Sequence, residues 1–437
     1  MKATRDIFDG VKALRPAARR IVEERRGERA EVAEESEQLA LLLGAAVKRN
    51  RYGEHLALRR WFSEPNAFEP HGDSLRLLAP DAPEEARDTE RWLFLDTETT
   101  GLAGGTGTYA FLVGIAWWDA GGLEVEQFFM RDHSEEHSVL LALRERLAER
   151  PVLVTFNGKS FDWPLLETRF RMTRVITPRR PLAHLDLLHP SRQLWRLRLG
   201  TARLPELEKH VLGWERGIDV QSELIPQIYF DFLRGGPAEP LVPIFRHNQM
   251  DLRGLAALAG RVFSVLASPQ ESECDALELY GVSKILARRG EFERARELYA
   301  RTLEAGLSED VGRSARRELA RLAKRGRDYA LATSLWEQLS ALPLGHAAAI
   351  EALVELAIHH EHRQRDSARA AQVTREALAQ LSAGLGSRNI SSAKYRALRS
   401  RLEHRLARLN RKLSRSLLSG IARAEAREGA AASNQQA

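Results

Sequence analysis

The sequence predicts a two-part fold, with an α/β domain over residues 91–265 and an all-α helical-repeat domain over residues 270–420. Two observations support this division. Short apolar runs alternate with amphipathic helical segments in the first region, which is typical of a mixed sheet flanked by helices. Strand patterns stop after residue 270, where Ala, Leu, Arg and Glu dominate. At 437 residues the chain also exceeds the roughly 100–200 residues of one domain.

The predicted α/β domain begins with three strands in succession. The apolar run WLFLD ends at Asp96, and the runs YAFLVGIAWW and LEVEQFFM form a hairpin through residues 120–122. An amphipathic helix over 138–150, the strand VLVTFNG and a helix over 163–172 follow. Strand and helix patterns then alternate to about residue 265.

The two ends of the chain have weaker patterns. We expect residues 1–90 to be a helical and irregular segment. Residues 19–43 have the composition of one or two exposed helices, and residues 62–90 are rich in Pro, Glu, Asp and Gly. The small and polar residues of 421–437 predict a disordered tail.

The composition excludes several classes of protein. The longest apolar run, over 109–118, is about half of the roughly 20 residues that a membrane-spanning helix needs. The N-terminus has no apolar segment of the secretory type. The single cysteine, Cys274, has no partner for an internal disulfide or a thiolate zinc site. We therefore expect a cytoplasmic protein with no membrane contact.

Positive charge is concentrated in the last third of the chain. Residues 266–437 carry 29 basic and 21 acidic side chains, an excess of +8, whereas residues 1–265 carry 37 and 39. A basic region joined to a neutral one indicates a polyanionic partner such as nucleic acid. A general bias towards arginine explains the same excess equally well.

A repeat is visible in the predicted helical domain. Small and large residues recur at i, i+4 and i+8, and the triplet reappears after 37 residues and again after a further 38. The triplets are Ala295–Tyr299–Leu303, Ala332–Trp336–Ser340 and Ala370–Thr374–Leu378. They resemble tetratricopeptide repeats, although the usual period is roughly 34 residues. The alternative is an antiparallel bundle without repeats.

Three clusters of acidic residues lie inside the α/β domain. Asp96 and Glu98 end the WLFL strand and point to one face, because side chains two apart in a strand do so. Asp162 lies near the first turn of the predicted helix over 163–172. His247 and Asp251 are four residues apart on a later helix and so lie on one of its faces. Each cluster alone has a simpler explanation, such as a helix cap for Asp162 or an exposed ion pair for His247 and Asp251.

Together and in this order, the clusters resemble the motifs of the DEDD exonuclease superfamily, the DnaQ-like branch of the ribonuclease H fold. The first, second and third motifs are matched by LDTETTGL, FNGKSFDWPLL and HNQMDLRGL. The intervening GGTGTYAFLVG is similar to bacterial YprB-like ribonuclease-H-like proteins, which also carry tetratricopeptide tails. The resemblance implies a ribonuclease H-like domain over residues 91–265.

The resemblance also implies a metal site and a base. Asp96, Glu98, Asp162 and Asp251 would bind two Mg²⁺ or Mn²⁺ ions, which prefer oxygen ligands and stabilise both the attacking and the leaving oxygen of a phosphodiester. His247 would be the general base. Histidine members of the superfamily usually have four residues between His and Asp and tyrosine members three, whereas this chain has His247 with three.

Other residues match positions near the substrate. Thr97 and Leu102 match positions at which the superfamily contacts the terminal nucleotide. Alternatively, Thr97 is an ordinary strand residue and Leu102 packs in the core. Asn157 belongs to the second motif, and Lys159 either meets a phosphate or is an ordinary solvated loop lysine. Asp186 matches an aspartate near the superfamily's site, and we interpret it as structural.

The resemblance implies a metal-dependent 3′–5′ exonuclease that hydrolyses single-stranded nucleic acid or exposed 3′ ends by a two-metal-ion mechanism. The alternative is a catalytically weak or inactive nucleic-acid-binding scaffold with tetratricopeptide repeats. The presence of all four carboxylates favours the enzyme. The helical repeats offer a surface for a protein partner, with a polymerase as one alternative. No motif separates DNA from RNA, since this depends on contacts to the 2′-hydroxyl.

Overall fold

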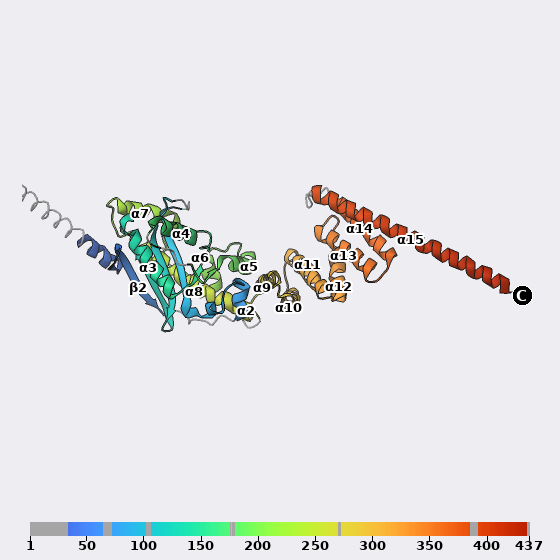
Figure 1. Cartoon of the computed structure of the whole chain (residues 1–437), viewed down its shortest axis with the longest axis horizontal. Helices are drawn as coiled ribbons and strands as arrows, with labels where there is room; N and C mark the ends of the chain where they lie inside the picture. Colours follow the sequence, from blue (N-terminus) through green and yellow to red (C-terminus); the bar gives the residue numbers. More distant parts are fainter. Residues whose placement is uncertain are drawn as a thin grey trace, which may run out of the picture. The chain divides into compact units, whose positions relative to one another are not determined.

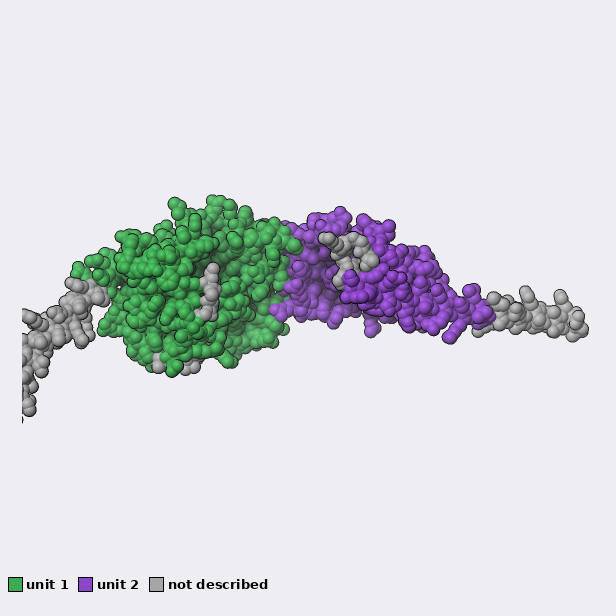
Figure 2. All heavy atoms as spheres, turned by 90° about the horizontal axis from the view of Figure 1, so that it is seen from above, with its two compact units in different colours: residues 1–273 green, residues 274–437 purple. Residues whose placement is uncertain are grey.

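The computed structural model describes residues 34–63, 72–101, 106–174, 176, 180–269, 272–384 and 392–434. The chain forms two compact units, Met1–Glu273 and Cys274–Ala437 (Figure 2). Within the described ranges, all strands belong to the first unit and the second unit is entirely helical. The predicted order of an α/β region followed by an all-α region is therefore confirmed.

The first unit is built on one mixed sheet of seven strands, in the order β1-β2-β5-β4-β3-β6-β7 (Figure 1). Every neighbouring pair from β1 to β3 is antiparallel, whereas β3 and β6, and β6 and β7, are parallel. The strands are β1 (Ala46–Asn50), β2 (Gly53–Phe62), β3 (Trp92–Thr99), β4 (Ala110–Asp119), β5 (Gly122–Phe129), β6 (Val152–Thr155) and β7 (Ala183–Asp186).

The sheet begins earlier in the chain than the sequence predicts. β1 and β2 lie within residues 1–90, for which we expected helical and irregular structure, and β2 pairs with β5 along most of its length. The reason lies in the burial pattern of β2. Four consecutive residues, His55 to Leu58, are buried, so both faces of the strand are covered and no alternation is visible. Residues 34–43 are helical, as expected, and the rest of that predicted helix lies outside the described residues.

Helices cover both faces of this sheet (Figure 1). The longer ones are α2 (Gly72–Leu78), α3 (Glu136–Glu149), α4 (Asp162–Thr173), α5 (Leu188–Leu199), α6 (Leu204–Leu207), α7 (Ile225–Leu233) and α8 (Leu241–Ala267). Short turns of 3₁₀ or π type lie at Glu84–Arg87, Thr89–Arg91, His133–Glu135, Glu208–Leu212 and Ser222–Leu224.

Alternate residues of β3 face different helices. Leu93 and Leu95 belong to a core with side chains of α3, α4 and α7. Trp92 and Phe94 belong to a second core with α2 and the last two-thirds of α8. Side chains of β3 continue to point alternately to the two faces of the sheet as far as the polar end of the strand. The even-numbered acidic residues of β3 therefore face α8, and Thr97 faces the side covered by α4.

The second unit is a succession of helices in which each packs against the next (Figure 1). They are α9 (Ala276–Arg289), α10 (Phe292–Glu304), α11 (Glu309–Arg325), α12 (Tyr329–Ser340), α13 (Ala347–His362), α14 (Ser367–Gly384) and α15 (Ser392–Asn434). Residues 421–434 end α15 and do not form the disordered tail that we expected. Ala, Arg and Glu dominate this stretch, and all three have high helix propensity. None of the helices in the described part of the chain combines the length and apolar character of a membrane span.

The predicted repeat recurs in the backbone of the second unit. Gly290, Arg327 and Arg365 follow α9, α11 and α13, and all three have left-handed φ values of 86°, 63° and 58°. Their spacings, 327 − 290 = 37 and 365 − 327 = 38, equal those of the sequence repeat. The alanines that open the three triplets are fully buried. The unit thus repeats one helix–turn–helix element, and its assignment to the tetratricopeptide class stays a prediction.

The left-handed turns generate a stability prediction. A left-handed conformation costs a non-glycine residue roughly 1–2 kcal/mol. Replacement by glycine removes this cost, but part of the gain is lost because glycine has more conformational freedom in the unfolded chain. Arg327→Gly should therefore raise the free energy of unfolding by about 0.5–1 kcal/mol. The matched change Gly290→Ala should lower it by about 1 kcal/mol. Urea denaturation followed by circular dichroism measures both, and a loss of stability in Arg327→Gly would contradict the argument.

Candidate active site

The acidic end of β3 lies against α8. Asp96 and Glu98 are on the same face of the strand as Trp92 and Phe94, whose rings pack in the core that α8 covers. His247, Asn248 and Asp251 belong to the part of α8 next to this strand end. The structure therefore brings the first and third predicted clusters together.

A chain of amide side chains orients Asp96. Asn248 donates from Nδ2 to Asp96 Oδ2 at 2.7 Å, and its Oδ1 accepts a hydrogen bond from Gln127 Nε2 at 2.7 Å. Gln249 Nε2 in turn donates to Gln127 Oε1 at 2.7 Å. A Cβ at Gly114, the β4 partner of Asp96, would overlap the Asn248 side chain. Glycine at this position therefore leaves the space in which the amide reaches the carboxylate.

Asp162 lies at the start of α4 and joins the same site. It is the first residue of the helix, and the preceding Phe161 makes no side-chain cap, so Asp162 is not the cap residue that we considered. Thr97 Oγ1 donates to Asp162 Oδ1 at 2.5 Å. The hydroxyl of Thr97, which we predicted to touch the substrate, thus binds a carboxylate of the site.

The loop before α4 is held by Asp186. This buried carboxylate accepts hydrogen bonds from the backbone N–H of Asn157 at 2.8 Å, Lys159 at 3.1 Å and Leu188 at 3.1 Å. Asn157 has a left-handed φ of 69°. The structural role that we interpreted for Asp186 is therefore supported by its contacts. The Lys159 side chain is exposed, and Leu102 lies outside the described residues.

His247 stands between two sets of carboxylates. Its Nε2 lies 3.6 Å from Asp251 Oδ2 and 4.0 Å from Glu98 Oε1. Its Nδ1 lies 2.8 Å from Asp219 Oδ1, so the tautomer that donates to Asp219 carries the proton on Nδ1. In that tautomer the lone pair of Nε2 faces the site.

Arg216 neutralises part of the charge. Its guanidinium donates to Asp251 Oδ1, to Asp219 Oδ2 at 3.1 Å and to Glu208 Oε1 at 2.7 Å. Glu208 is itself buried, and a Cβ at Gly254 on α8 would overlap its carboxylate. One arginine thus ties α8 to the segment between α6 and α7.

Sequence reasoning missed Arg216, Asp219, Glu208 and the amide chain. Arg216 and Asp219 lie in WERGID, which matches no motif that we recognised. Asn248 directly follows His247 inside the third motif, and this position was the one local indication in the sequence that it belongs to the site. The other partners join residues that are distant in the chain, such as Gln127 and Asn248, 121 positions apart.

Burial and mutual repulsion raise the pKa values of Asp96, Glu98 and Asp162. Burial is the largest cause for Asp96, Glu98 and Asp162, and for Asp96 the charges of Asp251, Glu98 and Asp162 add to it. The pKa of Glu98 rises to about 7, although His247 opposes the shift. Burial alone would lower the pKa of His247, but Asp251 and Glu98 outweigh it and the pKa is raised. The site therefore favours the binding of positive charge.

The donor set fits hard divalent cations by its chemistry. Asp96, Glu98, Asp162 and Asp251 offer carboxylate oxygens from three separate elements, and Mg²⁺ and Mn²⁺ prefer such ligands. As the side chains stand, no group of three or more His, Cys, Asp or Glu in the described ranges is close enough to hold a metal ion. Thr97, Asn248 and Arg216 each bind one of these carboxylates instead.

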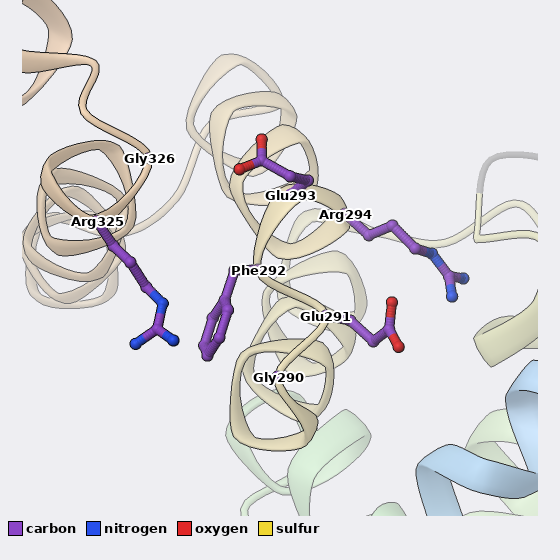
Figure 3. Close-up of a pocket in the computed structure, with 7 residues that line it drawn as sticks. All are labelled: Gly290, Glu291, Phe292, Glu293, Arg294, Arg325 and Gly326. Carbon is purple, nitrogen blue, oxygen red and sulfur yellow. The ribbon is translucent and has the colours of Figure 1, made fainter.

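A separate hollow of about 380 Å³ lies in the second unit, between the turn after α9 and the end of α11. Phe292 and Arg325 point towards one another there, with the guanidinium carbon 3.8 Å from the ring centre (Figure 3). The remaining lining residues are Gly290, Glu291, Glu293, Arg294 and Gly326. The hollow contains none of the predicted site residues and belongs to the packing of two hairpin turns.

Comparison with known proteins supports the ribonuclease H-like fold of the first unit. The family model described as the RNase_H superfamily matches residues 93–263, a range that contains every carboxylate of the site. A solved structure, the family B DNA polymerase from the hyperthermophilic archaeon Pyrobaculum calidifontis, gives a TM-score of 0.35 at 16% identity. That match covers 48% of this chain and only 29% of the polymerase chain.

A curated relative matches far more of the chain. The Bacillus subtilis protein YprB is 31% identical over 322 residues, which are 74% of this chain and 75% of the relative. The match extends beyond the range that the family model covers, since residues 93–263 are fewer than the 322 aligned residues. The chain therefore belongs to the ribonuclease H superfamily and is a relative of YprB.

Proposed function

We propose that this chain is a metal-dependent 3′–5′ exonuclease that hydrolyses phosphodiester bonds in single-stranded nucleic acid or at exposed 3′ ends. The ribonuclease H-like fold is a nuclease fold. One observation carries the proposal. Four half-buried carboxylates from β3, α4 and α8 lie together, and the charges of Asp251, Glu98 and Asp162 all raise the pKa of Asp96.

The four carboxylates would hold two Mg²⁺ or Mn²⁺ ions. Bound there, the ions would supply charge stabilisation for the attacking and leaving oxygens of the phosphodiester. The residues around them orient the ligands. Asn248 orients the carboxylate of Asp96, and Thr97 orients that of Asp162. Arg216 binds Oδ1 of Asp251, so that Oδ2 of Asp251 faces His247. Hydrogen-bonded carboxylates of this kind are the rule around metal ligands.

His247 is the base in this proposal, in spite of its unusual spacing from Asp251. Asp219 accepts the proton on Nδ1, so Nε2 can take a proton from a water molecule held near Glu98 and Asp251. Substrate contacts are proposed for Thr97, Asn157 and Lys159, of which Lys159 has the exposed ammonium group suited to a phosphate. Leu102, proposed for the terminal nucleotide, completes this set.

The direct test is cleavage of nucleic acid labelled at either end. The purified chain should shorten single-stranded DNA or RNA from the 3′ end and release mononucleotides with Mn²⁺ or Mg²⁺, but not with EDTA. Asp96→Asn should abolish cleavage, because the remaining carboxylates cannot hold both ions. Asp119→Asn, on an exposed aspartate of the β4–β5 hairpin, is the matched control and should cleave normally. Binding without cleavage under every metal condition would support the inactive scaffold instead.

The pKa of Glu98 predicts how the metal-free protein responds to pH. Because the folded pKa of about 7 exceeds the ordinary 4.5, the folded state is favoured below pH 4.5 and loses this advantage as pH rises through 7. The raised pKa of His247 acts in the same direction. The melting temperature in EDTA should therefore fall between about pH 5 and pH 8.

Glu98→Gln should flatten this decline, because glutamine does not ionise. Mn²⁺ should also remove much of it from the unchanged protein, since a ligand that binds only the folded state raises the melting temperature. Differential scanning fluorimetry at several pH values measures both effects. Identical pH profiles for Glu98→Gln and the unchanged chain would show that Glu98 ionises as an ordinary carboxyl group.

The role of His247 can be separated from that of the metal ligands. His247→Ala should reduce kcat about 10²–10⁴-fold while the affinity for an oligonucleotide stays nearly the same. Asp219→Asn should cause a smaller loss of kcat, because the ring remains but its tautomer is no longer set. His404→Ala, on an exposed histidine of α15, is the control. Full activity in His247→Ala would assign the proton transfer to another group.

A further inference from the structure

The positive charge of the second unit is not spread evenly over its helices. On the stacked helices many basic side chains are neutralised by neighbours. Arg321 binds Glu351 at 2.9 Å, and Lys324 binds Glu355 at 2.5 Å. Further pairs are Arg313–Glu309, Arg317–Glu318 and Arg296–Asp328. The Arg321 and Lys324 pairs join α11 to α13, and the Arg313 and Arg317 pairs lie within α11, so the repeat helices present a mixed surface.

Helix α15 has a different balance. Between residues 392 and 419 it carries nine Lys and Arg and a single acidic residue, Glu403. One side of the helix is apolar. Leu402 and Leu409 are buried, and Leu409 packs with Ala370 and Ala371 of α14. The basic residues therefore occupy the remaining sides, and α15 runs on past the other helices of its unit (Figure 1).

Some of these basic residues have structural partners. Arg405 and Arg408 both bind the buried carboxylate of Glu361 on α13, Arg405 at 2.6 Å. Arg399 binds Glu403 at 2.8 Å, within α15 itself. The first two attach α15 to the stacked helices. None of the three is available to a partner without a loss of these pairs.

Four further basic residues form what we call the α15 strip: Arg401, Arg411, Lys412 and Arg415. All are exposed, and none has an ion-pair partner among the side chains that the structure describes. At about 3.6 residues per turn, their side chains fall within an arc of about 100° that does not include Leu402 or Leu409. The strip spans about 21 Å at 1.5 Å per residue. One strand of B-DNA places roughly six phosphates along that distance.

We propose that the α15 strip binds the phosphate backbone of nucleic acid. The strip consists of charged groups without an apolar or aromatic neighbour among its members, which suits a phosphate backbone and not base recognition. An interfacial lipid helix needs a continuous exposed apolar face, whereas Leu402 and Leu409 are buried and the exposed Leu417 and Leu418 are adjacent residues that point about 100° apart. The proposal goes beyond the exonuclease activity, since binding through the strip requires neither metal ions nor cleavage.

The test compares two charge-matched variants of the full chain. The strip variant carries Arg401→Gln, Arg411→Gln and Arg415→Gln. The control carries Arg301→Gln, Arg369→Gln and Arg375→Gln, which alter exposed arginines of α10 and α14 that have no ion-pair partner among the described side chains. Glutamine keeps the helix propensity close to that of arginine. Circular dichroism and melting temperature should be the same for all three proteins.

Binding is measured in EDTA by fluorescence anisotropy with a 30-nucleotide single strand and its duplex, between 50 and 200 mM KCl. The slope of log Kd against log salt should become shallower by about 2–3 in the strip variant, since each lost phosphate contact removes roughly 0.7–0.9. The control should keep the original slope. An unchanged slope in the strip variant, or an equal loss in the control, would overturn the proposal.

Cleavage is scored separately, so the two proposals can fail independently. With Mn²⁺ present, the strip variant should still shorten a short labelled oligonucleotide at the rate of the unchanged chain, because its carboxylate site is intact. An inactive chain that binds with the predicted salt slopes would leave the strip standing and remove only the exonuclease.

Discussion

The constraint on which the site depends is the burial of like charges at the end of one strand. Asp96 and Glu98 share a face of β3, and Asp162 and Asp251 approach from two helices. Four half-buried carboxylates repel one another, and their partial burial makes that repulsion stronger because water screens it less. Such a cluster persists only where each group has compensation, either from hydrogen-bond donors or from cations.

The compensation comes from every layer of the first unit. Asn248 reaches Asp96 from α8 through a space that Gly114 leaves open, and Thr97 reaches Asp162 from the opposite face of β3. Arg216 joins Asp251 to Asp219 and Glu208. Each donor binds a carboxylate without supplying enough charge to cancel the whole cluster, and the raised pKa values of Asp96, Glu98 and Asp162 reflect the remainder. This remaining negative potential is what a divalent cation would meet.

The second unit manages its charge in the opposite way. Its repeat helices pair basic side chains with acidic ones of the same helix or of the helix two further on, as Arg321 of α11 does with Glu351 of α13. The left-handed turns at Arg327 and Arg365 keep the helix spacing of the sequence repeat, even though only the first turn has glycine at the left-handed position. In α15, two arginines bind Glu361, and the four residues of the α15 strip have no ion-pair partner among the described side chains. A shared net charge of +8 therefore hides a strongly uneven distribution.

The sequence by itself determined what depends on local periodicity. Alternation placed Asp96 and Glu98 on one face of a strand, helical spacing brought His247 next to Asp251, and the repeat predicted the helical unit. Only the tertiary structure decided which residues surround them. β1 and β2, Asn248 with Gln127, and Arg216 with Asp251 join positions far apart in the chain. Periodicity reports the face of a single element, whereas such contacts follow from how separate elements pack, which no local pattern contains.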